Sequence, residues 1–74
     1  MEKKIYKIVT KILKYKNKLN SQDSPRTIKT WDSLAHLEII SVLNQSLKIN
    51  ISFEDTLKIK NVGDIVKVCE KYKK

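Results

Sequence analysis

The sequence predicts an all-α fold, a small four-helix bundle in a single domain. The chain has 74 residues, a length that suits one small domain with a modest core. Its apolar residues recur at helical spacing in four separate segments. It contains one glycine and one proline, too few for the tight turns that an all-β chain would need. The expected order is long helix, long loop, long helix, short helix, medium helix.

The first predicted helix covers about residues 2–18. Its apolar stripe consists of five aliphatic side chains, Ile5, Ile8, Val9, Ile12 and Leu13, and lysines fill its other face. A loop over residues 19–32 follows, because Asn, Ser, Gln, Asp and Pro are gathered in its first half. A loop of this length needs apolar residues of its own to fix it, and we expect Ile28 and Trp31 to pack onto the helices.

The second predicted helix covers residues 33–48 and has a broad apolar surface. Four residues lie near one face, Leu34, Leu37, Ile40 and Leu47, and three more widen it, Ile39, Val42 and Leu43. Such a surface is typical of the central helix of a bundle. We expect Leu34 to turn inward and anchor this helix while Ser33 faces solvent.

Two shorter helices complete the predicted bundle, at residues 54–59 and 62–72. Ser52 followed by Asp55 has the spacing of a capping box, and Asn61 is a plausible N-cap for the last helix. The last helix carries an apolar stripe of Val62, Ile65, Val66 and Cys69. Cys69 is therefore expected to be a buried, unreactive thiol.

The formal net charge of +8 is concentrated at the N-terminal end, where seven of the 16 basic residues fall within residues 1–18. One function that this favours is a basic helical module that binds nucleic acid or an anionic surface. Two observations count against it. The aliphatic stripe of the first helix is needed for the core, and Arg26 is the single arginine, so base-reading motifs are not visible.

An enzyme is the least favoured class. One cysteine and one histidine do not make a structural zinc site, and we find neither a Gly-rich phosphate loop nor a nucleophile–base pair. The unpaired cysteine and the absence of a secretory signal pattern favour the cytoplasm. No apolar run approaches the roughly 20 residues that a membrane span needs. We therefore expect no catalytic residues, no metal and no membrane-spanning helix.

The residues most suited to carry a chemical modification are Asp32 and Ser33, at the start of the second helix and directly after the long loop. Unpaired backbone N–H groups at a helix start favour a nearby anion, so a phosphodiester on Ser33 would be well placed there. The alternative is that Asp32 or Ser33 is an ordinary N-cap, a role that contributes about 1 kcal/mol.

Three segments of the chain resemble the acyl carrier protein family, in order and at the family's spacing. Residues 31–40, Trp-Asp-Ser-Leu-Ala-His-Leu-Glu-Ile-Ile, look like the start of its second helix, which carries the attachment motif Asp-Ser-Leu. Residues 49–51, followed by Glu54 and Asp55, look like the link into its third helix. Residues 61–66, Asn-Val-Gly-Asp-Ile-Val, look like the start of its fourth.

The resemblance implies a non-catalytic carrier. A phosphopantetheinyl transferase would attach 4'-phosphopantetheine from coenzyme A to Ser33, and the terminal thiol would carry an acyl or aminoacyl group as a thioester. Asp32 would help the transferase to recognise the site, and Leu34, Leu37 and Glu38 match positions along the recognition helix. The implied partners are this transferase and acyl-loading and acyl-transferring enzymes. Separately, we expect a monomer, because nothing in the sequence demands more, and no nucleic-acid partner.

Two features depart from the carriers of fatty acid synthesis. Those carriers are usually acidic, whereas this chain is basic and its second helix has few acidic residues. Trp31 also precedes the Asp-Ser-Leu motif, which is more similar to stand-alone carriers of specialised pathways. These features favour a carrier dedicated to one group of enzymes.

Overall fold

The computed structural model describes residues 1–73 and contains four α-helices, as the sequence predicts. They are α1 (Glu2–Leu13), α2 (Ser33–Leu47), α3 (Phe53–Lys58) and α4 (Val62–Tyr72). The bounds of α2, α3 and α4 lie within one residue of those expected, so the all-α fold class is confirmed. None of the helices in the described part of the chain has the length and apolar character required to cross a membrane.

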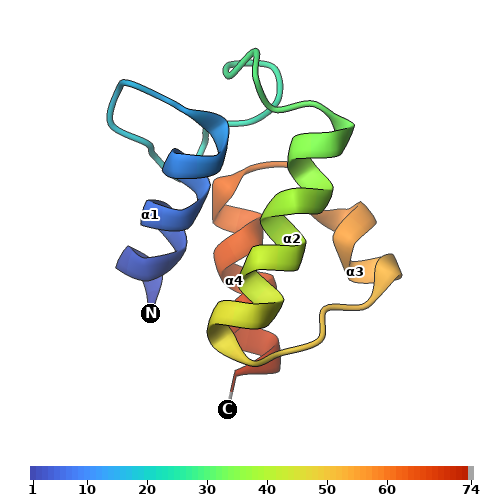
Figure 1. Ribbon diagram of the computed structural model, residues 1–74. Coiled ribbons are helices and arrows are strands. Elements are labelled where there is room, and N and C mark those ends of the chain that lie inside the picture. Colours follow the sequence, from blue (N-terminus) through green and yellow to red (C-terminus); the bar gives the residue numbers. More distant parts are fainter. Residues whose placement is uncertain (74) are drawn as a thin grey trace.

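The core lies where α1, α2 and α4 meet. α1 packs against both other helices and runs antiparallel to α2, while α3 lies on the opposite side of the bundle from α1 (Figure 1). The fully buried side chains come from these three helices, namely Ile5, Val9, Leu13, Ile39, Leu43, Val62, Ile65 and Cys69. Cys69 is fully buried, which confirms its predicted place in the core, and burial raises the pKa of its thiol to about 11.

Helix α1 ends five residues earlier than predicted, at Leu13 instead of residue 18. Lys14 adopts the left-handed conformation at φ 53°, and its N–H donates to the Lys11 carbonyl while that of Tyr15 donates to the Thr10 carbonyl. The physical reason is that a helix in a protein is stabilised mainly by packing of its apolar side chains against other elements, and less by helix propensity. Lysine or asparagine occupies most of residues 14–18, which therefore offer little apolar surface to bury in another turn.

Helix α2 buries only part of the apolar surface that the sequence predicts. The expected inward position of Leu34 is wrong, because its side chain is 78% exposed, and Leu37 is also largely exposed. The buried stripe instead starts at Ile39 and runs through three more residues, Ile40, Leu43 and Leu47. This spacing keeps one side of α2 against α1 and turns the other side outward.

The long loop over residues 14–32 is fixed to the helices by apolar and polar contacts. Ile28 and Trp31 are buried, which confirms that they pack onto the bundle. The carbonyls of Ser21 and Asp23 accept the N–H groups of Gly63 and Val62, at 2.8 and 2.9 Å, so the loop satisfies the first turn of α4. A Cβ at residue 63 would lie 3.2 Å from the Ser21 carbonyl, so glycine permits this close approach.

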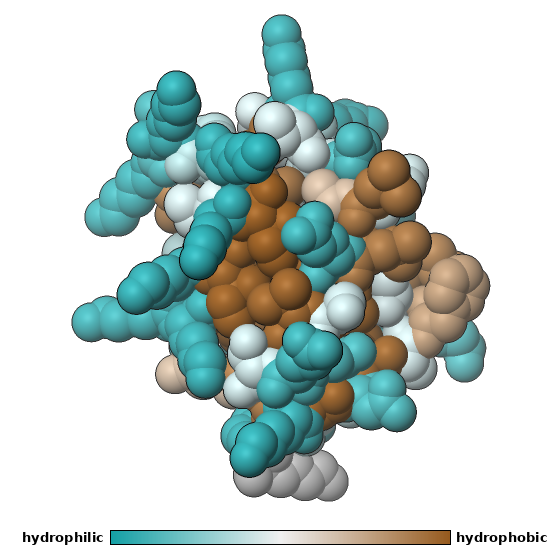
Figure 2. Space-filling model, viewed as in Figure 1, coloured by the Kyte–Doolittle hydropathy of each residue, from teal (hydrophilic) through white to brown (hydrophobic). Residues whose placement is uncertain are grey.

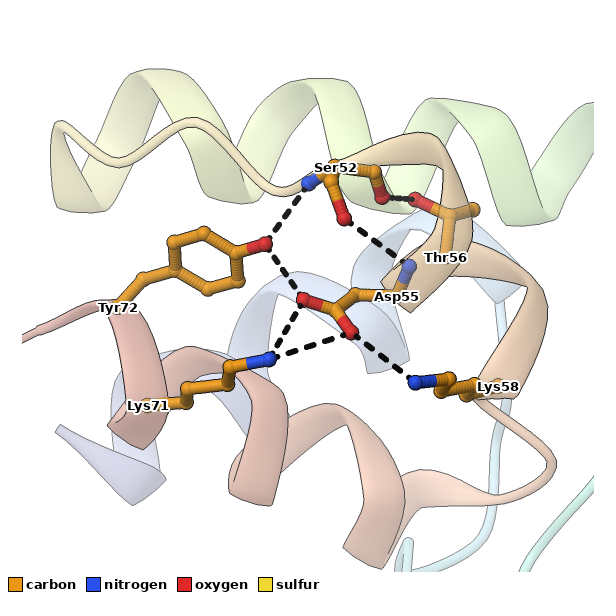
Figure 3. Close-up of polar contacts among 6 residues, drawn as sticks. All are labelled: Ser52, Asp55, Thr56, Lys58, Lys71 and Tyr72. Atoms are coloured by element: carbon orange, nitrogen blue, oxygen red, sulfur yellow. Dashed lines mark hydrogen bonds and ion pairs between the residues drawn. The ribbon is translucent and has the colours of Figure 1, made fainter.

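Helix α3 is held to α4 by a polar cluster around Asp55 (Figure 3). The Ser52 hydroxyl accepts the Asp55 N–H at 3.1 Å, as the capping box predicts. The Asp55 carboxylate, however, turns to α4, where it accepts hydrogen bonds from the Tyr72 hydroxyl at 2.5 Å and the Lys71 ammonium at 3.1 Å. The hydrogen bond from Tyr72, and then that from Lys71, holds the pKa of Asp55 below its ordinary value. The same Tyr72 oxygen accepts the Ser52 N–H, which ties the start of α3 to the end of α4.

Candidate functional site

Ser33 is the first residue of α2, and its side chain is exposed. The N-cap is Asp32, whose carboxylate accepts the N–H of Ala35 at 2.8 Å. Of the two N-cap candidates in the sequence, the structure thus assigns the role to Asp32. The Ser33 hydroxyl is not needed as the cap, and it lies at the end of the helix where a negative charge is favoured.

The backbone before Ser33 is fixed on one side by α1. The Thr30 hydroxyl donates a hydrogen bond of 2.6 Å to the carbonyl of Leu13, the last residue of α1. This bond satisfies a carbonyl that the helix end leaves without an intrahelical partner. It also fixes the loop three residues before Ser33, so the serine stands at a defined position on the bundle.

On the other side, a chain of hydrogen bonds links the start of α2 to α3. The buried Trp31 donates its indole N–H to Nδ1 of His36 at 3.0 Å, and Nε2 of His36 lies 3.1 Å from the Thr56 carbonyl. Because Nδ1 accepts, the proton of a neutral imidazole is assigned to Nε2, which donates to Thr56. His36 therefore links the start of α2 to α3 beside Ser33.

A groove of about 580 Å³ opens between α2 and α3, next to Ser33. The groove is lined by residues of the long loop, of the first turns of α2, of α3 and of the segment that follows α3. These are Pro25, Trp31, Asp32, Ser33, His36, Leu37, Phe53, Thr56, Leu57 and Ile59. Of the described residues that line it, Asp32 alone carries a full charge at neutral pH. The groove is thus suited to apolar groups, with a hydroxyl and a carboxylate at the Ser33 end.

An exposed apolar surface surrounds this groove. Leu37 and Leu34 of α2 are 54% and 78% exposed, and Phe53 and Leu57 of α3 are 71% and 64% exposed. Apolar side chains also dominate the α3 side of the molecule in the space-filling view (Figure 2). Exposed apolar patches on a small domain are typical of surfaces that bind another molecule.

The structure places the four predicted recognition residues at the surface. Asp32 and Leu37 both line the groove, whereas Leu34 and Glu38 do not. Leu34, Leu37 and Glu38 follow one another at helical spacing on the outward side of α2, which brings them together with Ser33 at one end.

Sequence reasoning missed Phe53 and Leu57 as surface residues. The pair has i, i+4 spacing on a helix of six residues, and large apolar side chains are by default assigned to the core. The polar residues that lie between them in the sequence could have shown their orientation. Asp55 and Thr56 are buried to make hydrogen bonds, which turns the other side of this short helix outward.

Two solved structures are similar to this chain over nearly its whole length. A protein from Mycobacterium tuberculosis described as an acyl carrier protein shares 27% identity at a TM-score of 0.87, covering 95% of each chain. The holo form of an acyl carrier protein from Geobacter metallireducens, solved by NMR in solution, shares 28% identity at a TM-score of 0.85. That match covers 96% of this chain and 83% of the other. No protein-family model and no curated protein matches the chain.

The fold and these similarities support a class of protein for this chain, the small helical carriers. The chain is similar to acyl carrier proteins in its fold, as its sequence motifs indicated, and the comparisons support an acyl carrier role.

Proposed function

We propose that this protein carries acyl or aminoacyl groups on a 4'-phosphopantetheine arm attached to Ser33. The observation that carries the proposal is the position of this serine. It is exposed at the N-terminus of α2, it is not needed as the N-cap, and an apolar groove opens beside it. The similarity to a holo acyl carrier protein adds support, because that protein has the same fold.

The residues present fit such an arm. The phosphodiester oxygens would lie at the first turn of α2, where free backbone N–H groups and the helix dipole favour negative charge. The hydrogen bonds of Thr30 and Trp31 keep the serine at the end of a rigid helix. When attached, phosphopantetheine supplies a terminal thiol on which an acyl group is held as a thioester.

We further propose that partner enzymes contact the exposed side of α2 together with α3. Asp32, Leu34, Leu37 and Glu38 form this surface on α2, and the structure adds the α3 residues Phe53 and Leu57. Because the surface is mostly apolar, binding of the transferase and of loading enzymes should depend little on salt. This composition also suits dedicated partners of a specialised pathway better than partners with strongly basic docking patches.

The protein itself performs no catalytic step in this proposal. Attachment requires that the Ser33 oxygen bonds to the phosphorus of coenzyme A that bears the pantetheine, while the P–O bond to the other phosphate of the pyrophosphate breaks and adenosine 3',5'-bisphosphate leaves. The base that takes the hydroxyl proton belongs to the transferase, because both ring nitrogens of His36 are engaged with Trp31 and Thr56. We expect the carrier to work in the cytoplasm, which its single unpaired cysteine favours.

Intact-protein mass spectrometry tests the proposal. The protein is incubated with coenzyme A, magnesium and a phosphopantetheinyl transferase of broad specificity. We expect the mass of one phosphopantetheine to be added to the wild type and to Ser41→Ala, a matched serine substitution on the exposed surface of α2, but not to Ser33→Ala. If all three proteins remain unmodified with several transferases while circular dichroism shows them folded, the proposal is wrong.

A further inference from the structure

A stripe of lysines covers the outward face of α1. Its members are Lys3, Lys4, Lys7 and Lys11, all exposed, and Lys14 continues it at the C-cap. Helical spacing places them opposite the fully buried Ile5 and Val9. Figure 2 shows long hydrophilic side chains gathered on the α1 side of the molecule, away from the apolar α3 side.

The charges of this stripe are not balanced within the described structure. The ion pairs found in residues 1–73 join Asp55 to Lys58 and to Lys71, on the other side of the bundle. Lys4 makes a long hydrogen bond of 3.4 Å to the Ser46 carbonyl, which leaves its charge uncompensated. Like charges at i, i+4 spacing destabilise a helix slightly, so the folded state gains nothing from their arrangement. The stripe is therefore available to an external anionic partner.

The composition of the stripe distinguishes between classes of anionic partner. Protein–protein interfaces are enriched in arginine and aromatic residues and depleted in lysine, and specific phosphate recognition in nucleic acids favours the planar fork of arginine. The stripe contains lysine alone. Point charges on flexible stems suit a surface whose own charges are mobile, and clusters of four to eight basic residues on one helix face are typical of binding to anionic lipids.

We propose that α1 docks this protein onto the surface of a membrane that contains anionic phospholipids. The contact is electrostatic and does not insert into the bilayer, because Ile5, Val9 and Leu13 are fully buried in the core. A second groove, of about 550 Å³, lies alongside, and Lys7, Lys11 and Lys18 are among the residues that line it.

This orientation leaves the carrier site accessible. α1 and α3 lie on opposite sides of the bundle, so a membrane against the outward face of α1 does not cover the groove between α2 and α3 (Figure 1). The docking does not depend on the proposed modification of Ser33, and either proposal can fail without the other. It would hold the carrier close to enzymes that use lipid substrates.

Sedimentation with lipid vesicles tests this docking on the full chain. Vesicles of phosphatidylcholine mixed with phosphatidylglycerol are compared with vesicles of phosphatidylcholine alone. The stripe variant is Lys3→Gln, Lys7→Gln and Lys11→Gln, and the matched control is Lys29→Gln, Lys60→Gln and Lys67→Gln, which removes the same charge from exposed lysines elsewhere. Glutamine and lysine have similar helix propensities, so both variants should fold, as circular dichroism checks.

We expect the wild type to bind the anionic vesicles and not the neutral ones, and we expect added salt to release the protein from the anionic vesicles. The stripe variant should bind roughly a hundredfold more weakly, since each lysine near an anionic surface contributes about fivefold, and the control should lose less than about tenfold. Equal losses in both variants, binding to neutral vesicles, or no binding to anionic vesicles would each overturn the proposal. So would tighter binding to a DNA duplex or an RNA strand under the same salt conditions.

Discussion

Two leucines of α2 provide a direct test of which side of this helix faces the core. Leu43 is fully buried, so Leu43→Ala removes a packed side chain and leaves a cavity, at a cost of about 2–5 kcal/mol. A domain of 74 residues has a stability of roughly 4–11 kcal/mol, so this single change removes a large part of it. Leu34→Ala removes a side chain that is 78% exposed and should change the stability by less than about 0.5 kcal/mol.

Urea unfolding followed by circular dichroism and by the fluorescence of Trp31, the single tryptophan, measures both effects. The same two variants also separate folding from recognition. Because Leu34 belongs to the proposed partner surface, Leu34→Ala should lower kcat/KM of the transferase about tenfold, the loss expected when one leucine no longer packs against the partner. A loss of stability above about 1 kcal/mol in Leu34→Ala would show that Leu34 packs inward after all.

Three further predictions concern the contacts that hold the loop and the last helix. A carboxylate with a depressed pKa stabilises the folded state at neutral pH and loses this contribution as it is protonated, here between about pH 5 and pH 2. Tyr72→Phe removes the hydrogen bond that most lowers the pKa of Asp55. The unfolding free energy of this variant should therefore fall less over that pH range than that of the wild type. Thr30→Val removes the hydrogen bond to the Leu13 carbonyl and should cost about 1 kcal/mol in urea unfolding. Cys69, buried and with a pKa raised to about 11, should react with iodoacetamide at about pH 8 only as fast as the protein unfolds.

The two hydrogen-bond predictions each have a control on the same fold. Tyr6→Phe and Thr10→Val change the same side chains on α1 and should leave the pH dependence and the stability nearly unchanged. A pH profile of Tyr72→Phe identical to the wild type would contradict the role given to its hydroxyl. Unchanged stability in Thr30→Val would contradict the importance of the loop contact. Rapid alkylation of Cys69 without urea would show that the thiol is accessible.

Local sequence signals predicted most of the fold. The N-caps at Ser52 and Asn61 and the apolar stripe of α4 were correctly identified, because each depends on residues within one or two turns of one another. The end of α1 and the outward position of Leu34 and Leu37 on α2 were not predicted. The end of α1 depends on how little apolar surface residues 14–18 can bury, and the Leu13 carbonyl at this end is satisfied by the Thr30 side chain, which is distant in sequence. The inward face of α2 was ambiguous because nearly every turn of this helix carries apolar residues, and only packing against α1 selects one side.

The candidate site was also predictable only where it depends on residues that are close in sequence. Asp32 and Ser33 are adjacent and form a motif, so the sequence identified them as the chemically interesting pair. The groove beside them depends on α3, which His36 joins to α2 through the Thr56 carbonyl. Nothing in the spacing of His36 predicts a partner 20 residues away, and so the exposed surface of α3 became visible in the structure alone.

Locating the modification on the chain tests the central claim most directly. The protein is treated with coenzyme A and a phosphopantetheinyl transferase and digested with trypsin, and the peptide of residues 30–48 is fragmented in the mass spectrometer. This peptide contains three serines, Ser33, Ser41 and Ser46, so fragmentation is needed to tell them apart. We predict that the added phosphopantetheine is found on Ser33 alone. A modification on either of the other serines, or none on this peptide, would contradict the assignment of the start of α2 as the carrier site.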